Sequence, residues 1–174
     1  MHSMHVIGID PGLGGTGYAV LEAVDGGCAV REMGCITSSS RAPLEARIGR
    51  IFEGLQAVLE RWRPELMILE GLYSDYTFPR TAIVMGHVRG AICLASHLAG
   101  ARVVEYGATE VKRALTGSGR AGKQQVMKAV TRLLALEERP GSEHVSDALA
   151  LALVGLSRAS RPAARRSGGE RRER

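Results

Sequence analysis

The chain of 174 residues has few aromatic residues, few cysteines and no long hydrophobic run. Its three cysteines, Cys28, Cys35 and Cys93, are odd in number and lack the spacing of a metal site, which argues against a disulfide framework. We therefore expect reduced core thiols in a cytoplasmic protein. No segment approaches the length of a membrane span, and the N-terminus lacks a signal-peptide pattern, so we expect no membrane partner.

Most of the chain also has no net charge. Of the 23 basic and 18 acidic residues, seven and two lie in residues 158–174, so 16 of each sign remain elsewhere. The last segment is rich in Arg, Pro, Gly and Ser and has too few apolar residues to form a core. We predict one domain over residues 1–157 and a disordered basic tail over 158–174, which either keeps the chain soluble or attracts nucleic acid weakly.

Hydrophobic patterning predicts an α/β fold with the element order βββαβαβααα. A hairpin turn joins the second and third strands, which gives the sheet an antiparallel start. Ser142 is expected to cap the last helix. The strands are expected over residues 6–9, 17–24, 28–37, 66–69 and 102–106, and the helices over 43–63, 80–99, 109–115, 123–136 and 142–157.

Carboxylates stand at the ends of two predicted strands. Asp10 follows the first strand and opens a Pro-Gly turn, and Glu70 ends the strand over 66–69. If these strands are parallel neighbours, both acids lie at the edge where open α/β sheets keep their sites. Asp147 lies in the first turn of the last helix, and His144 shares its face. The alternative is that Asp10 only opens a surface turn and Asp147 only complements the helix dipole.

Clustered carboxylates repel one another unless a cation lies between them. Two divalent ions about 3.5–4 Å apart would relieve that repulsion and stabilise the attacking and leaving oxygens of a phosphodiester. The chain shows no Ser-His-Asp arrangement and no reactive-cysteine context that would favour covalent catalysis. The sequence therefore predicts metal-dependent phosphoryl chemistry at Asp10, Glu70 and Asp147, with the imidazole of His144 beside them.

Lysine occurs at three positions only, all within a stretch of seventeen residues around a Gly/Ser-rich loop. Compact ammonium charges gathered in this way suit contacts with phosphate. The alternative is a solvated helix face. Together with two arginines, these lysines form the densest basic patch outside the tail: Lys112, Arg113, Arg120, Lys123 and Lys128.

Three of the seven aromatic residues follow Glu70 directly: Tyr73, Tyr76 and Phe78. Aromatic rings beside a metal site suit stacking on unpaired bases. The alternative is that they cover the sheet edge.

Three motifs in order, Gly-Ile-Asp-Pro-Gly at 8–12, Leu-Glu at 69–70 and Asp-Ala-Leu-Ala-Leu-Ala at 147–152, resemble the RuvC Holliday junction endonucleases of bacteria. The resemblance runs from about residue 5 to 156. It implies a ribonuclease H-like fold with a five-stranded mixed sheet flanked by helices, and a homodimer. It also implies symmetric nicking of like strands of a four-way DNA junction in recombination and repair, and a branch-migration helicase complex as partner.

The resemblance also implies roles for particular residues. Asp10, Glu70 and Asp147 would hold two divalent ions per subunit, Mg²⁺ or Mn²⁺. Lys112 and Lys123 would contact the scissile strand or stabilise its charge, and Tyr73 would act against the opened bases of the junction. In the family, the fourth ligand is an Asp that lies three residues before the last acid. This chain has His144 at that position, and Glu143, one residue earlier, is a rival ligand.

The helix predicted over 80–99 carries Gly86 and Gly90 four residues apart, which flattens one of its faces. That face either packs on the sheet or, as the resemblance implies, contacts a second subunit. Other functions remain as alternatives: an RNA-processing nuclease of the same fold, an inactive junction-binding module, or a fragment of an actin-like ATPase or sugar kinase. Actin-like ATPases and sugar kinases need a second phosphate loop and a second lobe, and neither is visible in this sequence.

Overall fold

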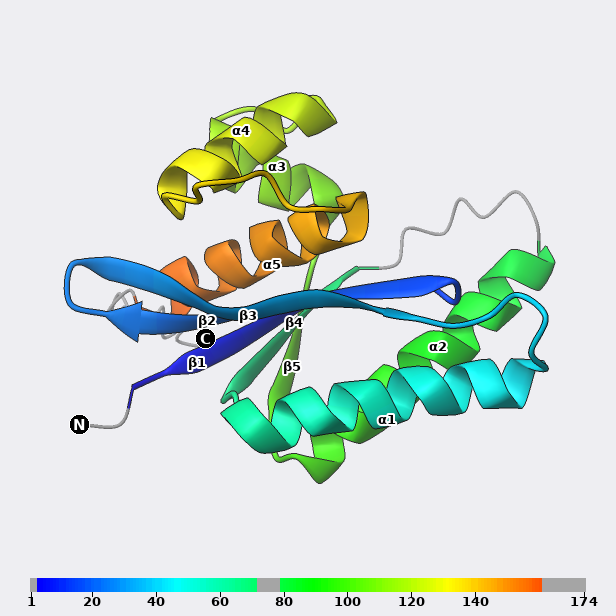
Figure 1. Cartoon of the computed structure of the whole chain (residues 1–174). Helices are drawn as coiled ribbons and strands as arrows, with labels where there is room; N and C mark the ends of the chain where they lie inside the picture. The colour runs from blue at the N-terminus through cyan, green and yellow to red at the C-terminus, as the bar shows by residue number, and fades with distance from the viewer. Residues whose placement is uncertain (1–2, 72–78, 161–174) are drawn as a thin grey trace, which may run out of the picture.

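The computed structural model describes residues 3–71 and 79–160. These residues form a five-stranded sheet with helices on both faces (Figure 1). The predicted element order is confirmed. The strands are β1 (His5–Asp10), β2 (Gly15–Val24), β3 (Gly27–Thr37), β4 (Leu66–Glu70) and β5 (Arg102–Tyr106), and the helices are α1 (Leu44–Trp62), α2 (Pro79–Leu98), α3 (Ala108–Thr116), α4 (Lys123–Leu133) and α5 (Glu143–Ala159).

The sheet is mixed, with the strand order β3-β2-β1-β4-β5. The first three strands pair antiparallel, whereas β1 with β4 and β4 with β5 pair parallel. In the β1–β4 pair, Ile9 lies opposite Leu69. The residues that follow them, Asp10 and Glu70, therefore end neighbouring strands at the same edge, as the sequence predicts.

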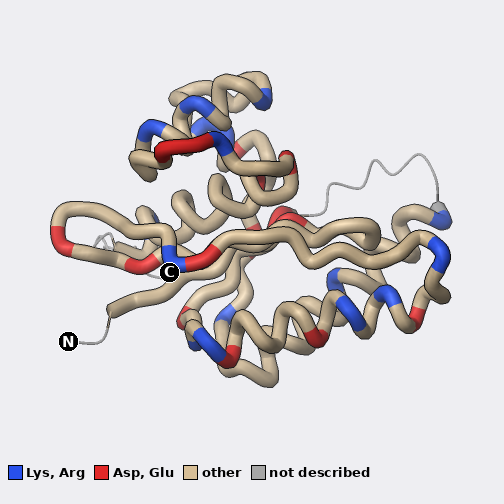
Figure 2. The backbone as a smooth tube through the Cα atoms, viewed as in Figure 1, with Lys and Arg blue, Asp and Glu red and all other residues tan. Residues whose placement is uncertain are grey.

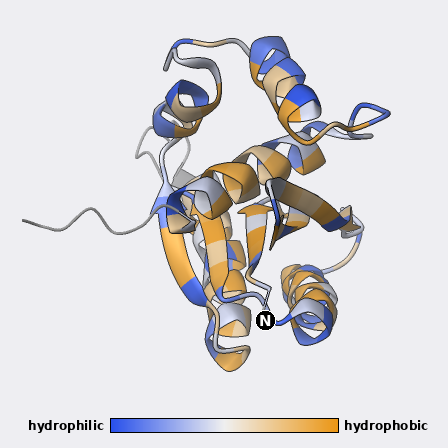
Figure 3. Cartoon of the chain, turned by 90° about the vertical axis from the view of Figure 1, so that its left-hand side faces the viewer, coloured by the Kyte–Doolittle hydropathy of each residue, from blue (hydrophilic) through white to orange (hydrophobic). Residues whose placement is uncertain are grey.

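The helices make two layers of different thickness (Figure 1). On one face α1 and α2 lie side by side, and their apolar residues form a core with Ile7, Ile9 and Leu69. On the other face α5 lies directly on the sheet, and α3 and α4 pack over it. Figure 3 shows the strands largely in the hydrophobic colour between these layers.

Helix α5 lies unusually close to the backbone of β1 and β2. A Cβ added to Gly8 would lie 2.1 Å from the carbonyl oxygen of Ala148, and one added to Gly17 would lie 2.1 Å from that of His144. Real Cβ atoms do not approach a backbone atom so closely. Glycine is therefore required at both positions, and the contact fixes the first turn of α5 over the end of β1. Ser142 caps that turn as predicted, because its side chain accepts a hydrogen bond from the amide of Val145 at 3.2 Å.

Two predicted details are wrong. Helix α4 ends at Leu133 rather than at residue 136, since the backbone turns at Ala135, which has φ 47°. Leu134 and Leu136 still pack on the core, and so the apolar periodicity runs past the end of the helix. Cys93 is exposed rather than buried, because it lies on the outer side of α2 next to the buried Ile92.

The last helix runs two residues past its expected end at about residue 157. Helix α5 continues to Ala159, because Arg158 pairs with Glu110 and lies 4.3 Å above the centre of the Tyr106 ring. Residues 161–174, the rest of the predicted basic tail, lie outside the described residues.

One helix of the described residues is long and apolar enough to cross a membrane by length and composition alone, the α2 segment Arg80–Leu98. A core helix of a soluble protein passes the same test. In this structure α2 buries Val88, Ile92 and Ala95 against the sheet and α1, although only 28% of the apolar window is buried.

The close approach of α5 makes a prediction about stability. Replacing Gly8 by Ala would push α5 off β1, with a cost of about 1–3 kcal/mol for overpacking in a tight core. We expect a lower melting temperature and slower catalysis, because α5 carries His144 and Asp147. Gly49→Ala in α1 is the matched control, as a Cβ at Gly49 meets nothing within 4 Å. An unchanged melting temperature in Gly8→Ala would contradict the close contact.

Candidate active site

The site begins at Asp10, which is only 9% exposed although it ends a strand. Its Oδ2 lies 2.6 Å from Nδ1 of His144, a hydrogen bond that the ionised carboxylate accepts. Burial raises the pKa of Asp10, while His144 and the ammonium of Lys123 act in the opposite direction. The end of β1 thus holds a carboxyl group that is costly to ionise in place.

Glu70 and Asp147 complete a cluster of three acids drawn from β1, β4 and α5. Burial raises the pKa of both, and the negative charge of Asp10 raises each further. Asp147 also raises the pKa of Glu70, which shows that the acids lie within electrostatic reach of one another. The structure therefore brings Asp10, Glu70, His144 and Asp147 to one place.

Two of the predicted basic residues lie at this cluster. Lys112 and Lys123 line a small cavity of about 150 Å³ together with Glu70 and Asp147. Lys112 lowers the pKa of Glu70, and Lys123 lowers that of Asp10 and Asp147. Positive charge at the rim of the acids is the arrangement that a phosphate group needs.

Glu143, the rival ligand, points to a different partner. Its Oε2 accepts a hydrogen bond from Nζ of Lys123 at 2.6 Å, and both side chains are largely exposed. The pKa of Glu143 is lowered and that of Lys123 raised by this contact. Of the two candidates, His144 is the one that touches Asp10, and Glu143 holds the lysine.

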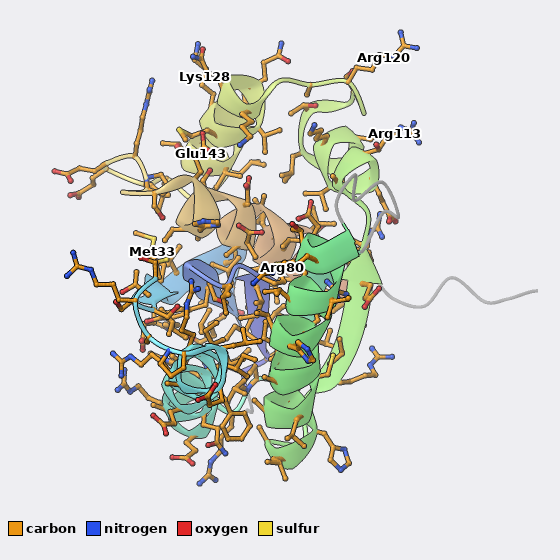
Figure 4. All side chains as sticks on the ribbon, turned by 90° about the vertical axis from the view of Figure 1, so that its right-hand side faces the viewer. Met33, Arg80, Arg113, Arg120, Lys128 and Glu143 are labelled. Carbon is orange, nitrogen blue, oxygen red and sulfur yellow. The ribbon has the colours of Figure 1, made fainter. Side chains whose placement is uncertain are left out.

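The other predicted basic residues lie away from the acids. Arg113 lines a groove among α3, α4 and the end of α5, and Lys128 lines a shallow groove beside Ser118 and Arg132. Arg120 is exposed in the α3–α4 loop. Figure 4 shows these three side chains on the outer helical layer, and Figure 2 shows further basic residues across it. They form a broad surface rather than part of the acid cluster. Tyr73, Tyr76 and Phe78 lie outside the described residues.

The donor set fits a divalent metal ion. It offers carboxylate oxygens and one imidazole. Asp10 raises the pKa of Glu70 and Asp147, an effect that a bound cation would reverse. In the described ranges, 3–71 and 79–160, no three His, Cys, Asp or Glu side chains are already gathered closely enough to hold an ion. Asp10, Glu70, Asp147 and His144 are the residues that would hold such an ion.

Fold and site together define the class of protein: a hydrolase of the ribonuclease H-like fold that acts on nucleic acid. Residues 6–155 match the family model described as crossover junction endodeoxyribonuclease RuvC. The chain belongs to the RuvC family, whose members are endodeoxyribonucleases that depend on divalent metal ions.

Individual relatives agree. The chain is 45% identical over 157 residues to crossover junction endodeoxyribonuclease RuvC of Rhodopirellula baltica, which covers 90% of this chain and 88% of the relative. Among solved structures, Thermus thermophilus RuvC is 36% identical with a TM-score of 0.82, covering 90% of this chain and 95% of that one. Thermus thermophilus RuvC in complex with Holliday junction substrate is 37% identical with a TM-score of 0.84, covering 90% and 94%. The predicted ribonuclease H-like fold and family are confirmed.

The raised pKa values make a prediction about stability. A carboxyl group whose pKa is higher in the folded than in the unfolded state lowers stability as pH rises through that interval, and the penalty persists above it. We expect Asp147→Asn to raise the melting temperature of the metal-free protein at pH 7 by about 2–4 °C, the shift for ~1 kcal/mol in a chain of this size. The gain should vanish below about pH 3, where the group is protonated in both states.

Asp25→Asn in the exposed β2–β3 turn removes a carboxylate outside the cluster and is the control, and at pH 7 it should not raise the melting temperature as Asp147→Asn does. A melting temperature for Asp147→Asn equal to or below that of the wild type at pH 7 would contradict the mutual repulsion of the acids.

Proposed function

We propose that this chain resolves Holliday junctions by nicking two like strands symmetrically, leaving 5′-phosphate and 3′-hydroxyl ends. The observation that carries the proposal is the meeting of Asp10, Glu70 and Asp147 at one sheet edge with Lys112 and Lys123 at its rim. Membership of the RuvC family supports the junction as substrate, since a relative was solved with one.

We propose that the three acids, with His144, hold two divalent ions, Mg²⁺ or Mn²⁺. Such a pair supplies an activated water and stabilises the leaving oxygen of the phosphodiester. The protein's own part is to bind and orient. The acids, from three elements, would hold the ions against the reacting phosphate, and Lys112 and Lys123 would offset its charge.

We also propose that the protein acts as a homodimer through the outer face of α2. Gly86 and Gly90 are exposed there, and an added Cβ at either would meet nothing within 4 Å. Ile83 and Leu94, 62% and 52% exposed, extend the same face. A two-fold contact through this face would give two like sites for two like strands. A branch-migration helicase complex as further partner, and Tyr73 as the residue that stacks on opened bases, complete the proposal.

A cleavage assay tests the proposed reaction. Wild-type protein with Mg²⁺ or Mn²⁺ should cleave a synthetic four-way junction and leave linear duplex and an RNA hairpin intact. Asp10→Asn should bind the junction with wild-type affinity, because binding rests on basic groups, while cleavage falls by several orders of magnitude. Cleavage at the wild-type rate by Asp10→Asn, or equal cleavage of the RNA hairpin, would refute the proposal.

His144 sets an expectation for the metal. Imidazole nitrogen favours metals of the first transition row over Mg²⁺, so the wild type should cleave faster with Mn²⁺ than with Mg²⁺. His144→Asp restores an all-oxygen set and should shift the preference toward Mg²⁺. Glu143→Gln serves as the comparison and should leave the metal preference unaltered. If Glu143→Gln abolishes cleavage and His144→Ala does not, Glu143 is the ligand.

The proposed dimer can be tested at Gly90. Ala is a better helix former than Gly by about 1 kcal/mol, so Gly90→Ala should stabilise an isolated subunit. If α2 meets a second copy closely, the added methyl groups should weaken the dimer at least tenfold in analytical ultracentrifugation. Gly49→Ala, on α1, is the matched control and should leave the dimer constant unchanged. A dimer unaffected by Gly90→Ala and by the bulkier Gly90→Leu would place the interface elsewhere.

A further inference from the structure

Arg89 is a buried arginine on the inner side of α2, where most of the other buried residues are apolar. It lies on α2 between Val88 and Ile92, and its side chain is 9% exposed. A buried guanidinium is costly unless its donors are satisfied by partners with good geometry. The hydrogen-bond partners of Arg89 therefore indicate its role.

The guanidinium bridges the ends of two strands. Nη1 donates to the main-chain carbonyl oxygen of Glu70 on β4, and Nη2 donates to Oε1 of Glu105 on β5, both at 2.5 Å. The strands are parallel neighbours, with Leu69 opposite Glu105, and the amide of Gly71 donates to the carbonyl of Tyr106 at 2.9 Å. The planar fork of Arg89 thus holds the place where β4 ends, one residue before the chain leaves the sheet edge.

That place is also where the chain supplies an acid. The carbonyl that Arg89 binds belongs to Glu70 itself, so the contact fixes the main chain from which the carboxylate extends. Burial, Asp10 and Asp147 raise the pKa of Glu70, and the charge of Arg89 lowers it. Arg89 therefore opposes the repulsion at Glu70 from the side of the sheet away from α5.

We propose that Arg89 is a positioning residue: its fork holds the end of β4 so that the Glu70 carboxylate faces Asp10 and Asp147, ready to share a divalent ion with them. This inference rests on the proposed metal site and adds a residue that touches neither ion nor DNA. Residues that orient ligands from behind typically change metal affinity roughly 10–100-fold when they are replaced.

The experiment measures metal binding without DNA. Melting temperatures are recorded against Mn²⁺ concentration for the wild type, Arg89→Gln, Arg89→Lys and Glu70→Gln, the last of which defines loss of a ligand. For both Arg89 variants we expect the concentration that gives half of the Mn²⁺-induced stabilisation to rise about tenfold. The same shift is expected in the Mn²⁺ dependence of junction cleavage, with junction affinity in EDTA unchanged.

Val58→Ala, which opens a cavity in the α1 core, is the control for stability alone. It should lower the melting temperature and leave the Mn²⁺ midpoint in place. A wild-type midpoint in Arg89→Lys, which keeps the charge and loses the fork, would overturn the proposal, and this variant decides it if Arg89→Gln does not fold. A wrong substrate assignment would appear in the cleavage assay only, whereas a wrong role for Arg89 would appear in the DNA-free midpoints.

Discussion

The contact between α5 and the backbone of β1 and β2 is the constraint on which the rest of the structure depends. It exists because Gly8 and Gly17 have no Cβ where the carbonyls of Ala148 and His144 pass. At the other end of the helix, Gly155 gives the same room to Ile68. The small residues of α5 therefore do more than fill the core. They place the first turn of α5 on the end of β1, so that Asp147 lies within electrostatic reach of Asp10.

Bringing acids together in this way works against stability. Burial raises the pKa of Asp10, Glu70 and Asp147, and the charge of Asp10 raises that of the other two further. The nearby cations Lys112, Lys123 and Arg89 act in the opposite direction but do not cancel these shifts. A divalent cation held by these acids would relieve the remaining repulsion. Such a site is unfavourable for the stability of the metal-free protein. It suits a nuclease, because the binding energy of the cation is then available at the place where the phosphodiester reacts.

Much of this arrangement could be predicted from the sequence. The apolar runs before Asp10 and Glu70, and the helix that follows Asp147, carry enough periodicity to place all three acids at strand or helix ends. The end of α4 was not predictable in this way, because Leu134 and Leu136 keep packing on the core after the helix has stopped. Arg89 was also missed, although an arginine within the apolar stripe of α2 was a visible signal. Its partners, a main-chain carbonyl on β4 and a carboxylate on β5, exist only once the strands are paired. The pairing of Lys123 with Glu143 likewise depends on how α4 packs on α5.

The most direct test of the central claim is to locate Mn²⁺ by its anomalous scattering in crystals of the protein soaked in the ion. The account predicts two peaks about 3.5–4 Å apart. Carboxylate oxygens of Asp10, Glu70 and Asp147 should surround them, with His144 turned from Asp10 toward one of the ions. Peaks bound elsewhere, or none at these acids in a protein that cleaves junctions with Mn²⁺ in solution, would contradict it.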